Sequence, residues 1–100
     1  CPTGPWITTA DTIPDPHGLA IRSSVNGTVK QDSNSRHLIF TIARIVEELS
    51  TVMTLLPGDI VATGTPAGVG FARTPPEYLH AGDVVACEIE GLGSLRNRIT

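Results

Sequence analysis

The chain has 100 residues, of which 40% are apolar and 17% charged, and its formal net charge at pH 7 is −3. This balance excludes an intrinsically disordered chain, and the seven scattered basic residues exclude a phosphate-tracking stripe, so we expect no nucleic-acid partner. No apolar run approaches the roughly 18 residues of a membrane span, so we expect no membrane partner. The length of 100 residues predicts one domain or part of one.

Residues 1–18 are rich in proline and glycine, and we expect little regular structure there beyond an extended piece over 6–9. Alternating residues predict a strand over 19–25. Asn26-Gly27 then predicts a two-residue turn, because both central positions of a type I′ turn need positive φ, and a second strand follows over 28–31. The alternation places four residues on one face of the first strand, namely Leu19, Ile21, Ser23 and Val25.

In the next segment, apolar residues recur with the period of a helix. This pattern predicts an amphipathic helix from about 35 to 51, capped by Ser33, Asn34 or Ser35. Its apolar stripe is expected to pack in the core and consists of Leu38, Ile39, Ile42, Ile45, Val46 and Leu49.

Beyond a turn at Pro57-Gly58, the apolar residues within 59–63 predict a short buried strand. An irregular segment is expected over 71–82, since Pro75-Pro76 forbids a helix. Two more strands are expected over 83–89 and 94–99. Five or six strands with one helix make the fold mainly β, or α+β.

The sequence "TGTPAGVG", residues 63–70, leaves the predicted strand over 59–63 as a glycine-rich loop. It lacks the Lys-Ser/Thr pair of a phosphate-binding loop and the third glycine of a dinucleotide fingerprint, which excludes those nucleotide sites. Pro66 favours an extended Thr65, and Gly64 leaves one flank open. The segment can therefore present the Thr65 hydroxyl and nearby N–H groups to a small carboxylate, or it is simply a turn that needs positive φ.

Other chemistry-bearing residues form no recognisable motif. Glu88 and Glu90 share a strand face, as metal ligands or solvated charges would. The three histidines lack zinc or triad spacing, and Cys87 is expected to be a small core residue because it alternates with Val85 and Ile89. Two cysteines, Cys1 and Cys87, are too few for a disulfide scaffold, so we expect the cytoplasm or else an organelle matrix. The residues themselves predict no catalytic group and no metal ligand.

Four stretches, in order, resemble the C-terminal half of the fumarylacetoacetate hydrolase family: CPTGPWITTADTIPDP, VNGTVKQDSNSRHLIF, LLPGDIVATGTPAGVG and GDVVACEIEGLGSLRN. The resemblance implies that residues 1–100 are the C-terminal part of a single catalytic domain whose N-terminal part is missing. It implies a mainly β (α+β) fold, a mixed β-roll or sandwich with one amphipathic helix, and a homodimer.

The resemblance also implies a Mg²⁺ or Mn²⁺ cofactor held by a Glu-x-Glu pair and an Asp, with a catalytic Lys. These residues are expected upstream of Cys1, and the opening without an initiator Met suggests a cut made inside a larger protein. Thr65 would contact the carboxylate or oxo group of the substrate, and Gly64 would allow its close approach. Residues 34–38 read Asn-Ser-Arg-His-Leu where relatives often have Asn-Thr-Ser-Asp-Met, so a specificity contact there is not carried over.

The implied activity is that of a metal-dependent hydrolase or isomerase of 2-oxo acids, such as acylpyruvates or 2-hydroxymuconate-type diacids. Carbon–carbon cleavage would proceed through a metal-stabilised enolate. An oxaloacetate decarboxylase is the alternative within the enzyme class, and a non-catalytic fragment with a structural or dimerisation role is the alternative outside it. We expect the isolated 100 residues to be inactive.

Overall fold

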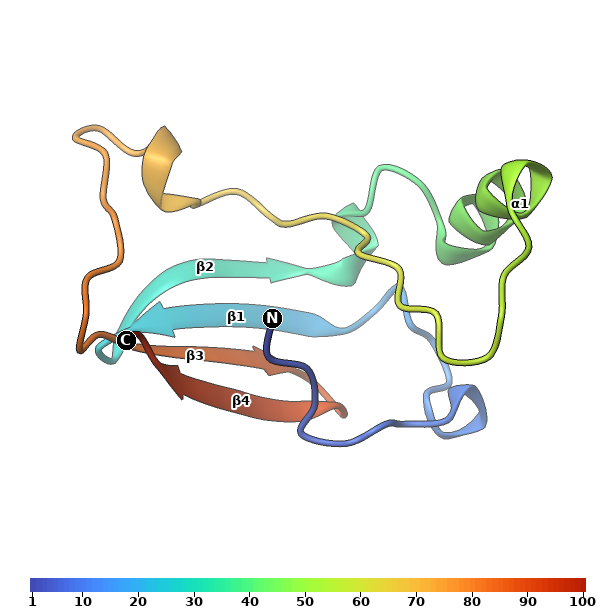
Figure 1. Ribbon diagram of the computed structural model, residues 1–100, viewed down its shortest axis with the longest axis horizontal. Helices are drawn as coiled ribbons and strands as arrows, with labels where there is room; N and C mark the ends of the chain where they lie inside the picture. Colours follow the sequence, from blue (N-terminus) through green and yellow to red (C-terminus); the bar gives the residue numbers. More distant parts are fainter.

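Four strands form one antiparallel sheet in the computed structural model, which describes residues 1–100 (Figure 1). The first hairpin is β1 (Ala20–Val25) with β2 (Thr28–Asn34), and the second is β3 (Val84–Ile89) with β4 (Gly93–Arg98). β1 pairs with β3 in the middle, so the strand order is β2-β1-β3-β4. Every pairing is antiparallel, so the parallel pairs of a mixed sheet do not occur among these strands.

The turn between β1 and β2 has the predicted geometry. Asn26 has φ of 50° and Gly27 has φ of 82°, which confirms positive φ at both central positions. The Asn26 side chain also accepts a hydrogen bond from Val84 N–H (2.9 Å) and donates one to the Asp83 carboxylate (2.8 Å). The turn is thereby tied to the start of β3.

A β-bulge interrupts the pairing of β1 with β2. Ser24 lies opposite Val29 and Ser23 lies opposite Gln31, so Lys30 is the extra residue, with no partner across the ladder. A bulge of this kind bends its strand and frees a backbone carbonyl from the ladder. Because β2 is the outermost strand, the Lys30 carbonyl is available to the segment beside it.

The helix begins later than predicted. Residues Ser35–His37 form a 3₁₀ turn, and α1 spans Ile42–Val52. Two hydrogen bonds hold residue 35 against Leu19, just before β1: Ser35 N–H donates to the Leu19 carbonyl (2.8 Å), and Leu19 N–H donates to Ser35 Oγ (2.9 Å). This contact keeps the chain from winding directly into α1.

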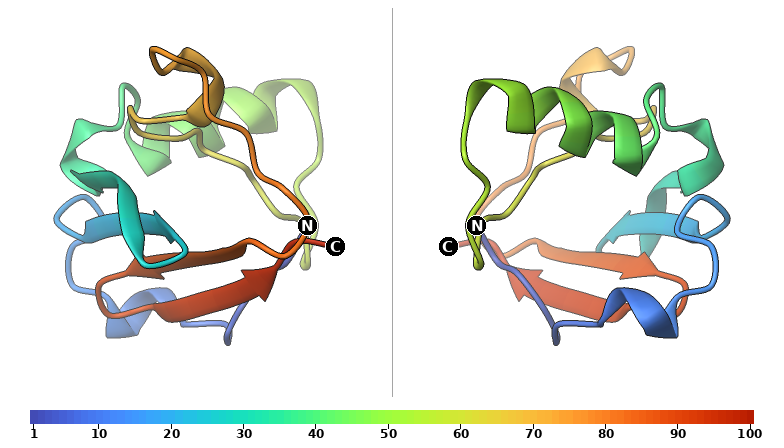
Figure 2. Two further views of the ribbon diagram at one scale, coloured as in Figure 1. Left: turned by 90° about the vertical axis from the view of Figure 1, so that its left-hand side faces the viewer. Right: turned by 90° about the vertical axis from the view of Figure 1, so that its right-hand side faces the viewer.

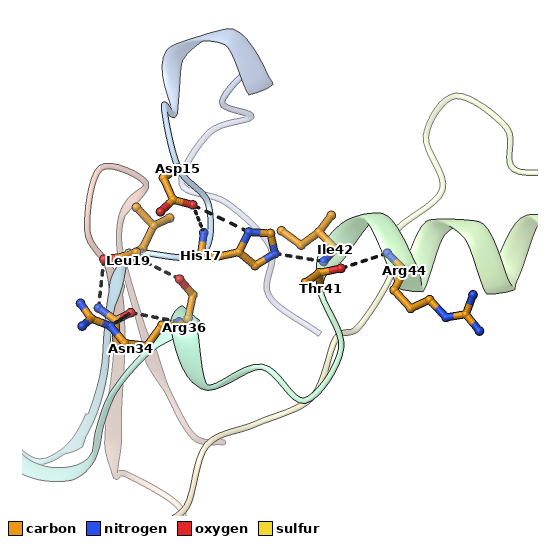
Figure 3. A network of polar contacts seen from close by, with 10 residues as sticks. Asp15, His17, Leu19, Asn34, Arg36, Thr41, Ile42 and Arg44 are labelled. Atoms are coloured by element: carbon orange, nitrogen blue, oxygen red, sulfur yellow. Dashed lines mark hydrogen bonds and ion pairs between the residues drawn. The ribbon is translucent and has the colours of Figure 1, made fainter.

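Thr41 and His17 together bind the free N–H groups at the start of α1 (Figure 3). Thr41 Oγ1 accepts from Arg44 N–H (3.3 Å), and His17 Nε2 accepts from Ile42 N–H (3.1 Å). Asp15 Oδ1 accepts from the His17 backbone N–H (2.9 Å) and lies 3.7 Å from His17 Nδ1. His17 therefore caps α1 from a loop that lies 25 residues earlier in the chain.

Two predicted extended segments are not strands. Residues 6–9 and 59–63 lie outside the sheet, so the chain has four strands and not five or six. No backbone–backbone hydrogen bond involves residues 60–68. The apolar run over 60–62 matches a strand, but a strand needs a neighbouring backbone, and none of the 100 residues supplies one.

No apolar side chain is buried, and Ser35 is the one buried residue. The predicted core stripe of α1 is only partly covered, and Ile39 just before the helix is 90% exposed. Cys87 is exposed and free, so its prediction as a core residue is wrong for this chain. In Figure 2, α1 and the segment after it lie on one side of the sheet and the N-terminal segment on the other. The Trp6 ring of that segment lies against Gly93. None of the helices has the length and apolar character that crossing a lipid bilayer would need.

Candidate functional site

The glycine-rich loop over 63–70 lies alongside the bulged strand β2 (Figure 1). A Cβ on Gly68 would sit 2.4 Å from the Lys30 carbonyl oxygen, so this close approach of backbone to backbone requires glycine. Arg73 joins the same two residues, since its Nη2 donates to the Lys30 carbonyl (2.5 Å) and its Nε donates to the Gly68 carbonyl (3.1 Å). The carbonyl freed by the bulge is thus the docking point of the loop.

Thr65 is held by one side chain of β2. Gln31 Nε2 donates to Thr65 Oγ1 (2.9 Å) and to the Pro66 carbonyl (2.7 Å). On its other side, Gln31 Oε1 accepts from Ser23 Oγ (2.9 Å) across the hairpin. A hydrogen-bonded row therefore runs from β1 through β2 to the loop, and it ends at the exposed Thr65.

Gly64 leaves open space beside Thr65. No atom outside residues 63–65 lies within 4 Å of the position that a Gly64 Cβ would occupy, and the residue has φ of +111°. Gly68 has φ of +107°. The interpretation of the loop as a turn that needs positive φ is therefore correct for both glycines, and it is compatible with ligand binding because the same conformation keeps the flank of Thr65 unobstructed.

An ion pair fastens the segment that follows the loop to β2. Lys30 Nζ lies 2.5 Å from Glu77 Oε2, and Arg73 Nε lies 3.9 Å from the same oxygen. The hydrogen bond from Lys30, and the positive charges of Lys30 and Arg73, hold the pKa of Glu77 below its usual value. Asp83 behaves similarly beside the Asn26-Gly27 turn, where hydrogen bonds from His80 N–H and Asn26 lower its pKa.

The remaining candidates do not assemble into a site. Glu90 accepts a hydrogen bond from Ala20 N–H (3.0 Å), a structural contact, and Glu88 is exposed. No group of three or more His, Cys, Asp or Glu side chains in the chain could hold a metal ion. The residues present therefore do not form the ligand set expected for Mg²⁺ or Mn²⁺. The expectation that residues upstream of Cys1 supply these ligands stays a prediction.

The sequence predicted Thr65 and Gly64 as substrate-binding residues, which stays a prediction, and it missed the residues that hold the loop in place. Gln31, Lys30 and Arg73 lie on a strand and in an irregular segment, without a local motif. The alternation of residues in the sequence does not predict the bulge, because the bulge depends on the pairing of β2 with β1. Only the Asn-Gly turn hinted that residues near 31 lie opposite residues near 23.

The sequence of the whole chain matches one family description, "Fumarylacetoacetate (FAA) hydrolase C-terminal", over residues 1–100. The chain belongs to the fumarylacetoacetate hydrolase family. The match confirms the resemblance of the four sequence stretches, and members of this family among the relatives below are enzymes.

Curated and solved relatives agree with this membership. The chain is 48% identical over 99 residues to the mitochondrial oxaloacetate tautomerase of Xenopus laevis, covering 99% of this chain and 31% of that protein. Fumarylacetoacetate hydrolase from Exiguobacterium antarcticum superposes with a TM-score of 0.96 at 43% identity, covering 100% of this chain and 36% of that one.

A third relative was solved with a metal and a 2-oxo acid. Maleylpyruvate hydrolase from Sphingobium sp. SYK-6, in complex with manganese(II) ion and pyruvate, superposes with a TM-score of 0.87 at 41% identity. That alignment covers 97% of this chain and 34% of the hydrolase. This chain therefore spans about a third of the length of each relative, and these likenesses confirm the mainly β (α+β) fold of the family's C-terminal part.

Proposed function

We propose that the protein containing this chain is a metal-dependent hydrolase or isomerase of 2-oxo acids, and that Thr65 binds the substrate's carboxylate or oxo group. The observation that carries the proposal is the exposed Thr65 hydroxyl beside the open flank of Gly64. Thr65 Oγ1 accepts a hydrogen bond from Gln31 and donates none within the chain, so its hydrogen is available to an anion.

The division of labour follows from the residues present. Mg²⁺ or Mn²⁺ would supply Lewis-acid stabilisation of charge on the substrate, with ligands outside residues 1–100, because this chain has no donor set for the ion. The manganese and pyruvate of the Sphingobium hydrolase support this proposal by family analogy. This chain's own contribution is to bind and orient the anionic end of the substrate.

Oxaloacetate is a second candidate substrate, favoured by the 48% identity to an oxaloacetate tautomerase. It is a 2-oxo acid too, so the same Thr65 contact would serve it, whether the reaction is tautomerisation or decarboxylation. Parallel assays of the full-length protein with oxaloacetate and an acylpyruvate, with Mg²⁺ and with Mn²⁺, distinguish the candidates. We also propose a homodimer, which sedimentation of the same full-length protein tests.

The test of the binding role is Thr65→Val in the full-length protein. We expect a loss of about 1 to 3 kcal/mol of stabilisation, roughly 5- to 150-fold in kcat/KM, because a hydrogen bond to a charged group is removed. Thr54→Val is the matched control, since Thr54 is exposed and makes no hydrogen bond with its side chain. Unchanged kinetics for Thr65→Val would leave the loop with a purely structural role.

A further inference from the structure

The hydrogen bonds of Gln31 fix the direction of its amide. The Pro66 carbonyl can only accept, so the group facing it at 2.7 Å must be Nε2 and not Oε1. Oε1 then faces Ser23 Oγ, whose hydroxyl donates to it at 2.9 Å. Both hydrogens of Nε2 are used, one on the Pro66 carbonyl and one on Thr65 Oγ1.

This direction determines what the Thr65 hydroxyl can do. Since Gln31 donates to Thr65 Oγ1, the Thr65 hydrogen cannot point back at Gln31 and is turned outward. An outward O–H is a donor, which is what a carboxylate or an oxo oxygen requires. Resting on the proposed function, we infer that Gln31 is a positioning residue, which directs the Thr65 hydroxyl hydrogen at the anionic end of the substrate.

Gln31 is itself held in place between the hairpin and the loop. The bulge at Lys30 sets it opposite Ser23, so that both side chains lie on one face of the hairpin. Arg73 binds the Lys30 and Gly68 carbonyls and so keeps the loop at a fixed distance from β2. Gln31 is partly buried between these elements. If its side chain were replaced by an apolar one, the lost hydrogen bonds to the loop would not be restored by another side chain of the hairpin.

A double-mutant cycle in the full-length protein tests the coupling, with pyruvate as the probe and Mn²⁺ present. Binding is measured by calorimetry for Gln31→Leu, Thr65→Val and the double variant. We expect Gln31→Leu to weaken pyruvate about 3- to 10-fold and Thr65→Val about 10-fold or more. The double variant should bind like Thr65→Val alone, because Gln31 acts through the hydroxyl that Thr65→Val removes.

Gln31→Glu adds a readout that a merely structural role would not move. The introduced carboxylate, when ionised, only accepts, so the Thr65 hydroxyl would donate to it and turn away from the anion. Protonation of that carboxyl restores a donor, so the ratio of variant to wild-type affinity should rise as pH falls toward about 4.3. Thr28→Glu places the same charge at an exposed position of β2 and should leave this ratio flat.

The outcomes separate the two proposals. If Thr65→Val binds pyruvate like wild type, the proposed anion role of Thr65 fails. If Thr65→Val weakens binding but Gln31→Leu does not, the binding role stands and the positioning role of Gln31 is wrong. Multiplicative effects in the double variant would also overturn it. Should Gln31→Leu prove unfolded by thermal melting, a pH-independent ratio for Gln31→Glu is the overturning result.

Discussion

Replacing Gly68 by alanine should detach the glycine-rich loop from β2. The new Cβ would lie 2.4 Å from the Lys30 carbonyl oxygen, about 1 Å closer than an ordinary contact, and that oxygen belongs to a strand that cannot shift cheaply. The residue also has φ of +107°, which costs about 1 to 3 kcal/mol for any residue with a side chain. Moving the loop outward by about 1 Å would break the bonds from Gln31 to Thr65 and Pro66, each worth about 1 kcal/mol.

The expected total is about 3 to 5 kcal/mol, read from urea unfolding of the full-length protein, together with weaker pyruvate binding by calorimetry. Gly58→Ala is the matched control, because Gly58 has φ of +98° and a Cβ there would have no atom outside residues 57–59 within 4 Å. It carries the backbone strain without the collision. If the two variants lose equal stability and both keep wild-type affinity for pyruvate, the loop is not held by its approach to Lys30.

Three further outcomes are expected. Hydrogen bonds and nearby cations lower the pKa of Asp83 and Glu77 in the folded state, so both carboxylates stabilise the fold above about pH 4. This stability is lost as pH falls through the lowered pKa values of the folded state. Thermal melts of full-length Asp83→Asn from pH 3 to 7 should therefore depend less on pH than those of the wild type. His17→Ala removes the acceptor of Ile42 N–H, so hydrogen exchange at the start of α1 should accelerate, with a loss of about 1 kcal/mol, whereas unaltered exchange would refute the cap. The isolated 100 residues should show no cooperative unfolding transition and no turnover of an acylpyruvate, because no apolar side chain is buried; a sharp urea transition monitored by near-UV circular dichroism would contradict this.

Local signals in the sequence predicted the parts of the fold that depend on neighbours along the chain. The hairpin at Asn26-Gly27, the strands near 83–89 and 94–99 and the existence of α1 all follow from dihedral preference and from periods of two or 3.6 residues. The start of α1 did not follow, since Asn34 caps a 3₁₀ turn and not the helix. Its Oδ1 accepts from Arg36 N–H (3.0 Å), while the bonds between Ser35 and Leu19 hold that turn against β1.

The wrong or missing predictions share one physical cause. Each depends on a contact, present or absent, between parts of the chain that are far apart in the sequence. The run over 60–62 is apolar enough for a strand but lacks a hydrogen-bonding neighbour. Cys87 alternates as a buried residue would, yet no distant part of this chain buries it, and it is exposed. The contact of Gln31 with Thr65 joins residues 34 positions apart, and no local propensity reports such a pairing.

The extra residue in β2 also decides which chemical group meets the loop. In an uninterrupted ladder, Lys30 would take the place opposite Ser23, and an ammonium group would stand where the neutral amide of Gln31 now lies. The length of this hairpin therefore determines which functional group contacts the loop, as well as the geometry of the strands. A graft or redesign of the turn that adds or deletes a single residue would exchange the two side chains, even with every amino acid of the loop retained.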